Sequence, residues 1–210
     1  MPETPACPSW RDQVSPASSV SGGPLRRPVL EVARGLLGTR LVSTLGGERV
    51  EVVLVETEAY GGPDDPASHA AVRAGRTDRN RAMFGGAGRL YLYRSYGVHW
   101  CLNVVAGEEG APQAVLLRGA EVLSGRDVVA RRRGGRAPLA AGPGRLAQAL
   151  GVVDGGLYGH NLADPPLQLV AGWEVPDARV ARSGRIGVSR GAQRRWRFYL
   201  RDAPGVSPVR

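Results

Sequence analysis

Three neighbouring segments decide the fold of this chain: VLVETEAYGGPDDPASH (residues 53–69), RTDRNRAMF (76–84) and GRLYLYRSYGVHWCLNVVAG (88–107). The first opens as an apolar strand and carries its acidic residues at the end, where a sheet gives way to a loop. The third alternates apolar and aromatic residues on both sides of Tyr96-Gly97, which predicts a hairpin with a tyrosine at its tip. We expect the rest of the chain to support these segments.

On the N-terminal side, residues 1–23 are rich in Pro, Ser and Gly and lack an apolar period, which predicts a disordered tail. We assign residues 24–210 to a single domain. Apolar residues at helical spacing predict a helix over residues 29–37. The Gly46-Gly47 pair predicts a hairpin that leads into the strand at residues 48–60.

On the C-terminal side we expect short helices between further strands. Thr77 is placed to cap a short helix through Phe84, and Ser124 is placed to cap a helix that ends in a basic run. Residues 143–150 predict a helix that begins at a proline and ends at a glycine. The remaining predicted strands are residues 113–122, 167–170, 186–188 and 196–200.

The composition favours a polyanionic partner. The 210 residues carry a formal net charge of +9, and all 28 basic residues are arginine. Such a surface suits nucleic acid first and an anionic membrane second, although an arginine-biased genome would give the same composition. No apolar run approaches the ~20 residues of a membrane span, and no secretion signal is visible. Cys7 and Cys101 suggest no disulfide, so we expect a cytoplasmic protein, associated with the nucleoid if bacterial.

Glu58 is the sharpest candidate for chemistry. A period of two places it on the same strand face as Tyr60, at the end of a buried strand, where a carboxylate can hold and deprotonate a water. Alternatively, Glu56 and Glu58 both pair with arginines at the sheet edge, with Glu56 as the more buried structural partner. The spacing alone leaves both interpretations open.

A metal site is a second possibility for the acidic residues. Asp64, Asp65 and His69, together with the glutamates, would suit a hard cation. Two aspartates between prolines are, however, typical of a turn in which the side chains bind the backbone. We therefore expect neither a metal nor a cofactor.

The tyrosines are either core residues or parts of a ligand site. Burial of Tyr96 at a turn tip is difficult, and a side chain that projects from a turn can act as a wedge in a base stack. Tyr60 and Tyr93 would sandwich a planar ligand, with stacking of about 1–3 kcal/mol for each face. A cationic ring gains further from the negative face of a tyrosine.

The hairpin register decides whether a pocket exists. A two-residue loop at Tyr96-Gly97 puts Tyr93 opposite Trp100 and turns Asn103 to the other side. A three-residue loop at residues 95–97, or a bulge, puts Tyr91, Tyr93, Cys101 and Asn103 on one face. Only the second arrangement builds a pocket.

Seven blocks in order resemble the alkyladenine DNA glycosylase family, also called 3-methyladenine DNA glycosylases. They are VETEAY (55–60), His69, RNRAMF (79–84), GRLYLYRSYG (88–97), CLN (101–103), VLLRGAEVL (115–123) and GPGRLAQALG (142–151). The resemblance runs from about residue 28 to residue 208. It implies one α+β domain with a curved antiparallel β-sheet, flanking helices and a projecting β-hairpin.

The resemblance also implies how water is activated. Glu58 would be the general base, and Arg118 and the backbone carbonyl of Ile186 would help to place the water. The reaction implied is hydrolysis of the N-glycosidic bond of alkylated purines, 3-methyladenine and 7-methylguanine, in double-stranded DNA by a monomeric repair enzyme. These bases already carry a positive charge and leave easily, whereas hypoxanthine is neutral and no clear acid is visible, so its removal stays open.

For the flipped base, the resemblance implies a pocket lined by Tyr60, His69 and Tyr93. Asn103 would clash with the 2-amino group of normal guanine, and Tyr96 would enter the duplex in the space left by the nucleotide. Extrusion costs less for a damaged base.

The absence of lysine predicts an enzyme that does not nick DNA. Strand nicking needs an amine that forms a Schiff base, and this chain has only its N-terminal amine. Three features depart from the family pattern: His99 stands where an aromatic is frequent, Val98 is a smaller neighbour of Tyr96, and Gly85-Gly86 replaces bulkier residues before the hairpin. The N-terminal end of the 143–150 helix with Arg145 would bind a phosphate, or the helix simply packs.

Two functions of other classes stay open at this point. One is a basic module that recognises damaged DNA or RNA without catalysis. The other is a metal-dependent nuclease that uses Glu56, Glu58 and Asp65.

Overall fold

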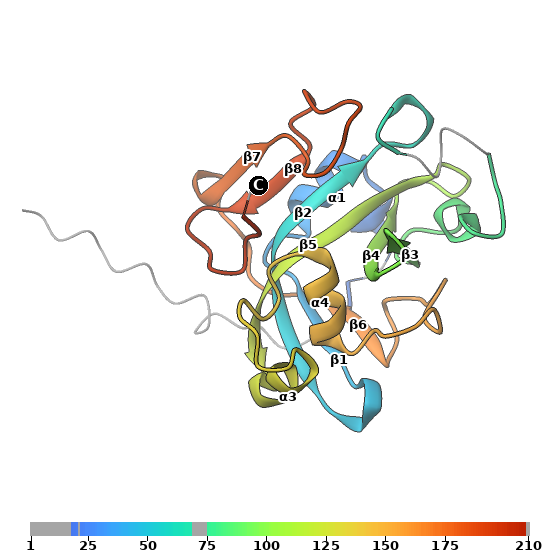
Figure 1. Cartoon of the computed structure of the whole chain (residues 1–210). Coiled ribbons are helices and arrows are strands. Elements are labelled where there is room, and N and C mark those ends of the chain that lie inside the picture. Colours follow the sequence, from blue (N-terminus) through green and yellow to red (C-terminus); the bar gives the residue numbers. More distant parts are fainter. Residues whose placement is uncertain (1–17, 21, 69–74, 209–210) are drawn as a thin grey trace, which may run out of the picture.

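The computed structural model describes residues 18–20, 22–68 and 75–208. In this part of the chain, eight strands form one curled antiparallel sheet (Figure 1). The strands along the sheet are, in spatial order, β3 (Leu90–Ser95), β4 (His99–Ala106), β5 (Gln113–Ser124), β2 (Val50–Tyr60), β1 (Arg40–Ser43) and β6 (Leu167–Val170). The two remaining strands are β7 (Val180–Ser183) and β8 (Arg197–Leu200).

The long strand β2 holds the sheet together. It pairs with β5 on one edge, and on its other edge first with β1 and then with β8. Its pairing with β5 shifts register between Leu54 and Glu56 and again between Glu56 and Thr57. Such irregularities bend and twist a strand. β8 therefore takes over from β1 at Glu56, where the acidic residues begin.

Helices cover the sheet and close the core. α1 (Val29–Gly35) packs against β2 and β5, and α4 (Pro143–Leu150) packs against β4 and β5. α3 (Arg126–Arg132) packs against α4. None of these helices, nor any other helix among the described residues, is long and apolar enough to cross a membrane. The predicted α+β domain with a curved antiparallel sheet, flanking helices and a projecting hairpin is confirmed.

Most predicted elements lie where local patterns placed them. The 29–37 helix, the hairpin around Gly46-Gly47 and the helix at 143–150 are α1, the β1–β2 pair and α4. Short 3-10 helices occupy part of the connections: Gly23–Arg26, Leu45–Gly47, Gly62–Asp64, Arg81–Phe84 and Asp177–Arg179. The predicted tail falls largely outside the described residues, but Ser19 pairs with Val170 of β6.

Two predicted helix caps are wrong. Ser124 is the last residue of β5 and pairs with Glu51, so Gly125, with a left-handed φ of 73°, precedes α3 instead. Because Ser124 is paired within the sheet, its backbone does not take the position that a helix cap requires. Thr77 does not cap either, because its N–H and hydroxyl both donate to the Asn80 side chain. The result is a turn, and the following helix starts only at Arg81.

The strand predicted at residues 186–188 is also wrong. These residues form a turn, and the Ile186 N–H donates to the carboxylate of Glu58 instead of a neighbouring strand. The strand in this region is β7, which comes earlier and pairs with β8. Its four residues are too few to give a visible alternation.

The hairpin has a three-residue loop, so the pocket-forming alternative is confirmed. Ser95 pairs with His99, which leaves residues 96–98 as the loop, one position later than the predicted 95–97. Tyr93 pairs with Cys101 and Tyr91 pairs with Asn103. Because directly paired residues share a face, this register brings these four side chains to the same side of the ribbon.

Candidate active site

A cleft of about 720 Å³ opens beside the hairpin. Its walls come from the end of β2, the segment before β3, both hairpin strands, β5 and the turn at residues 186–188. The residues of this wall that the sequence singled out are Tyr60, Tyr91, Tyr93, Tyr96, Cys101, Asn103, Arg118 and Ile186. Segments far apart in the chain thus converge on one cleft.

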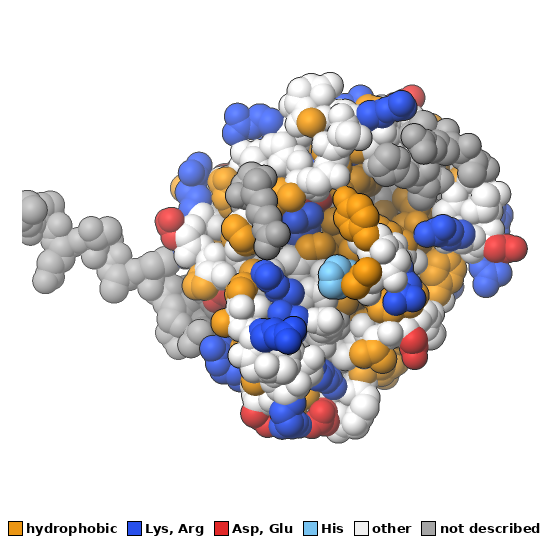
Figure 2. Space-filling view, viewed as in Figure 1, with side chains coloured by type: hydrophobic (Ala, Val, Ile, Leu, Met, Phe, Trp, Pro, Cys, Tyr) orange, Lys and Arg blue, Asp and Glu red, His pale blue; other side chains and the backbone are white. Residues whose placement is uncertain are grey.

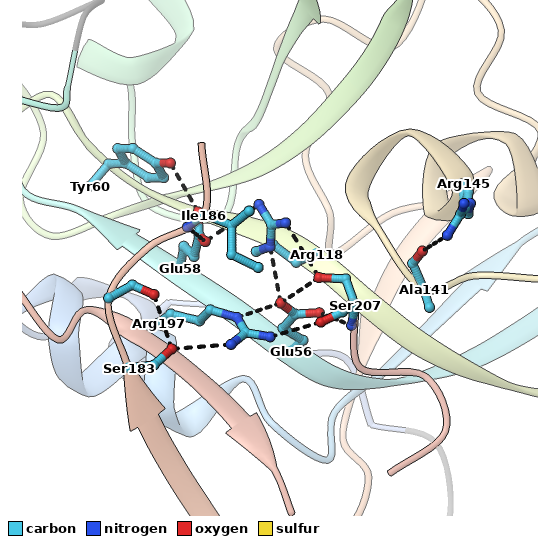
Figure 3. Close-up of polar contacts among 11 residues, drawn as sticks. Glu56, Glu58, Tyr60, Arg118, Ala141, Arg145, Ser183, Ile186, Arg197 and Ser207 are labelled. Atoms are coloured by element: carbon cyan, nitrogen blue, oxygen red, sulfur yellow. Dashed lines mark hydrogen bonds and ion pairs between the residues drawn. The ribbon is translucent and has the colours of Figure 1, made fainter. Parts of the chain in front are cut away.

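Glu58 lies directly behind the cleft wall. Its side chain is 0% exposed and accepts hydrogen bonds from the Tyr60 hydroxyl at 3.0 Å and the Ile186 N–H at 2.8 Å. The Nη1 atom of Arg118 lies 3.4 Å from the same carboxylate. All three partners line the cleft, and Figure 3 shows them around Glu58. The Ile186 contact uses its N–H, whereas the resemblance implied a role for its carbonyl.

Burial gives Glu58 an unusual proton affinity. Desolvation raises the pKa of the Glu58 carboxyl above its usual range, and the charge of Arg118 with the two hydrogen bonds partly counteracts this. Desolvation and the nearby Glu58 also raise the pKa of the Tyr60 phenol well above its usual range. Tyr60 therefore stays protonated and donates to the carboxylate. A carboxylate with raised proton affinity suits a general base.

Glu56 has a different role, although it lies only two residues away. Its buried carboxylate accepts from Arg118 Nε at 3.0 Å and from Arg197 Nε at 2.6 Å. The backbone N–H of Ser207 donates to it at 2.6 Å and the Ser207 hydroxyl at 2.8 Å. Glu56 is thus held in a saturated ion network (Figure 3), whereas the three polar partners of Glu58 all line the cleft.

The tyrosines form an aromatic lining. The rings of Tyr91 and Tyr93 are stacked with centroids 5.9 Å apart, and Tyr158 meets Tyr91 edge-on at 6.2 Å. Asn103 is buried and its amide donates to the carbonyls of Tyr91 at 3.1 Å and Cys101 at 3.3 Å. The Asn103 side chain is thus pinned on the cleft wall between the hairpin strands.

Tyr96 projects from the hairpin tip and is 93% exposed. Its φ is 51° and that of Gly97 is 69°, both in the left-handed region. Val98 beside it is 63% exposed. On the face in Figure 2, arginines surround a central area of hydrophobic and histidine atoms, and acidic side chains lie at the periphery. This distribution suits a polyanion.

One of the remaining candidate residues has no placement in the structure, and two others are bound within the protein. His69 lies outside the described residues. Asp65 is buried and bound to both terminal nitrogens of Arg185 and to the N–H groups of Gly61 and Ala67, as in the predicted turn. The described residues contain no group of three metal-ligating side chains. Arg145 donates to the Ala141 carbonyl at 3.0 Å (Figure 3).

Sequence reasoning missed three residues of this region. They are Arg185, Arg197 and Ser207, all buried. Arg197 shares strand β8 with apolar neighbours, and its paired position opposite Glu58 in the sheet was not visible from spacing. Local signals do not reveal them, because their partners lie far away in the chain.

A buried base-like carboxylate behind a tyrosine-lined cleft, on a face rich in arginine, defines the class as an enzyme that acts on nucleic acid. Comparisons with known proteins agree. A sequence model described as "Methylpurine-DNA glycosylase (MPG)" matches residues 24–204. The chain belongs to this family, and it is therefore a DNA repair hydrolase that cleaves N-glycosyl bonds.

Several bacterial relatives carry the name "Putative 3-methyladenine DNA glycosylase". The relative from Nocardia farcinica is 48% identical over 188 residues, covering 85% of this chain and 85% of its own length. The relative from Streptomyces avermitilis is 45% identical over 191 residues, with 88% of each covered. The relative from Agrobacterium fabrum is 47% identical over 186 residues, covering 87% of this chain and 89% of its own length.

Proposed function

We propose that this DNA glycosylase removes 3-methyladenine and 7-methylguanine from double-stranded DNA, after the damaged nucleotide has swung out into the cleft. The observation that carries the proposal is the placement of Glu58. Its polar partners Tyr60, Arg118 and Ile186 all belong to the cleft wall. The names of the relatives support the choice of 3-methyladenine.

In the proposed reaction, a water bound at the Glu58 carboxylate attacks C1′ of the deoxyribose. The N-glycosidic bond breaks, its electron pair leaves with the base, and Glu58 takes a proton from the water. Because N3- and N7-alkylated purines are cationic, this electron pair neutralises the leaving group. Since Glu58 is fully buried, the water has to reach it beside Arg118 and Tyr60 when the nucleotide binds. The Ile186 carbonyl is proposed to help place that water.

The aromatic lining is proposed to hold the base. Tyr60 and Tyr93 would stack on the cationic ring, with His69 beside them. Asn103, pinned by its two backbone contacts, would leave no room for the 2-amino group of normal guanine. Tyr96, exposed at the hairpin tip, would fill the gap in the duplex. We propose that the enzyme acts as a monomer.

The test uses defined duplexes that contain 3-methyladenine, 7-methylguanine or hypoxanthine at one position. Glu58→Gln should lower single-turnover release of the alkylated bases by about 10²–10⁴-fold while leaving lesion binding intact. Glu31→Gln, at an exposed position of α1, is the matched control and should release bases at the wild-type rate. Release by Glu58→Gln near the wild-type rate would refute Glu58 as the base. Lesion binding without release by the wild-type protein would favour a non-catalytic damage reader.

The same duplexes test strand nicking. Because the chain has no lysine, we expect abasic product strands to stay intact until heat or alkali is applied. Strand cleavage by pure protein in the absence of both would contradict a monofunctional enzyme.

A further inference from the structure

Arg185 lies inside the molecule between two aromatic rings. Its guanidinium carbon is 4.8 Å from the centroid of Tyr60 and 5.1 Å from the centroid of Trp196. The arginine is 5% exposed, and its side chain is fully buried. A planar guanidinium stacks well on aromatic faces, so the guanidinium of Arg185 packs over the Tyr60 ring.

The guanidinium is fixed in this position by hydrogen bonds. It donates to both carboxylate oxygens of Asp65, at 2.5 and 2.7 Å, and to the carbonyl of Ala59 at 2.9 Å. Asp65 is in turn held by the Gly61 N–H at 3.1 Å. A Cβ on Gly61 would lie 2.9 Å from the Trp196 ring, so the loop and the ring are in close contact. A two-point pair of this kind restricts orientation as well as distance.

Arg185 is therefore linked to both hydrogen-bond donors of Glu58. It contacts Tyr60 through the ring, and Tyr60 donates its hydroxyl to the carboxylate. It is also the residue before Ile186, whose N–H is the second donor. We propose that Arg185, held by Asp65 and Trp196, is a positioning residue that aims both donors at Glu58. This inference rests on the proposed role of Glu58 as the base.

Arg185 acts through position more than through its charge, because Asp65 neutralises it at contact distance. The groups that do act on Glu58 come from four strands and from the turn packed against it. They are Arg118 on β5, Glu56 and Tyr60 on β2, Tyr93 on β3, Cys101 on β4 and the Ile186 N–H. Of these, Arg185 directly supports only Tyr60 and Ile186.

The expected effect has a definite sign. Hydrogen bonds to a carboxylate favour its charged form and lower its pKa. If Arg185 is removed and the two donors drift, Glu58 binds its proton more tightly. A general base works only when deprotonated, so the acidic limb of the pH–rate profile should move to higher pH.

The experiment measures single-turnover release of 7-methylguanine by Arg185→Met from about pH 5 to about pH 9. We expect the acidic limb of the pH–rate profile to shift to higher pH by about one unit. At pH values on the acidic side of the limb, this shift is about a tenfold loss of rate. Arg182→Met is the matched control: its guanidinium stacks 4.8 Å from the Phe198 centroid, yet Arg182 is exposed and does not line the cleft. It should keep the wild-type profile. A lower rate for Arg185→Met with an unmoved limb would overturn the inference.

Two further variants separate loss of positioning from loss of folding. Arg185→Met combined with Asp65→Leu removes both charges of the buried pair, which is tolerated better than leaving one unpaired. A displaced limb in this folded variant supports positioning, and a wild-type limb rejects it. In a Tyr60→Phe background, Arg185→Met should move the limb less than it does alone, because the two changes share one donor. Full additivity would reject the route through Tyr60.

The inference and the proposed function can fail separately. If Glu58→Gln releases bases at the wild-type rate, the function assigned to Glu58 is wrong whatever Arg185 does. If Glu58→Gln is inactive while Arg185→Met keeps the wild-type rate and limb, only the role of Arg185 is wrong.

Discussion

Glu56 and Glu58 are chemically identical and lie two positions apart on β2, yet their surroundings differ. Glu56 is bound by two arginines and by Ser207 at both its N–H and its hydroxyl. Glu58 has one arginine at 3.4 Å and two neutral donors. Burial without full compensation is what raises the pKa of Glu58. The first side chain stabilises the fold, and the second is held ready for chemistry at some cost in stability.

These surroundings predict opposite effects of the same substitution on stability. Glu56→Gln should lower the free energy of unfolding by about 3–5 kcal/mol, because it leaves buried arginines without their counter-charge. Glu58→Gln should raise the melting temperature at neutral pH, because it removes a desolvated charge. Thermal unfolding of both variants beside the wild type is the measurement. Two melting temperatures that fall together would contradict the division of roles.

The direction of the Glu58 pKa shift also determines how the stability of the protein depends on pH. Since its folded-state pKa is raised, its favourable contribution is present below the unfolded pKa and is lost as pH rises through the folded pKa. The stability advantage of Glu58→Gln should therefore be largest at neutral pH and above. It should shrink as the pH falls through the raised pKa, where the wild-type carboxyl is protonated too.

The hairpin β3–β4 shows how an element combines a pocket wall with a projecting tip. Its three-residue loop sets the register that turns Tyr91, Tyr93 and Asn103 toward the cleft. The same loop holds Tyr96 with a left-handed φ of 51°, a conformation that L-residues other than Asn and Asp rarely adopt. A tyrosine that is 93% exposed in this uncommon backbone conformation fits a role in contact with a partner molecule.

Tyr96→Asn tests this reading of the hairpin. Asparagine tolerates left-handed backbone, so the free energy of unfolding should stay unchanged or rise by up to about 1 kcal/mol. Excision from duplex DNA should fall about tenfold or more, because the wedge no longer offsets the unstacking cost. Urea unfolding and single-turnover excision measure the two effects. Val153→Asn, at an apolar position 75% exposed and outside the hairpin, is the control for loss of surface hydrophobicity. Undiminished duplex excision by Tyr96→Asn would exclude the wedge.

At the scale of the whole molecule, the C-terminal segment (residues 205–207) completes the surroundings of the site. Gly205 passes so close to β5 that a Cβ on it would lie 2.5 Å from the Ala120 carbonyl oxygen. Gly119 faces it, with a Cβ position 2.3 Å from the Gly205 oxygen. This close passage brings Ser207 onto Glu56, and Ser207 also accepts from Arg118 at 3.3 Å. A segment near the end of the chain thus reaches the arginine beside the candidate base.

Gly205→Ala should therefore destabilise the fold by about 1–3 kcal/mol, since backbone atoms cannot yield to the added methyl group. Gly35→Ala is the matched glycine substitution: nothing lies within 4 Å of its Cβ position, at the end of α1. Because alanine favours helix, this variant should gain up to about 1 kcal/mol. Urea unfolding of both variants checks the pair. Equal stabilities would show that the C-terminal segment does not pack as described.

The net charge of +9 makes a prediction for the molecule as a whole. Binding to DNA releases counterions, so affinity for a lesion-containing duplex should fall linearly in a plot of log K against log salt. The rate of base release at saturating protein should change little, because Glu58 is buried away from the solvent ions. Binding titrations and single-turnover rates over a salt series measure both. A salt-independent affinity would argue against phosphate contacts by the arginine-rich face in Figure 2.

Local patterns in the sequence were enough for most elements. Helical spacing gave α1, a proline and a glycine bounded α4, and paired glycines marked the β1–β2 turn. These signals work because backbone conformation at a cap or turn depends on a few adjacent residues. They failed at Ser124, because the predicted capping residue pairs within the sheet instead. They also failed at residues 186–188, where the backbone N–H of Ile186 donates to the distant carboxylate of Glu58.

Spacing alone left the roles of Glu56 and Glu58 open, and it also left the hairpin register open. The sequence did indicate a carboxylate at the end of a buried strand, a tyrosine at a turn tip and a strongly basic surface. The three-dimensional fold assigned the roles, because the deciding partners come from far along the chain: Arg118 from β5, Arg197 from β8 and Ser207 from the C-terminal segment. A charge is stabilised or left desolvated by what surrounds it in space, and one-dimensional spacing does not contain that information.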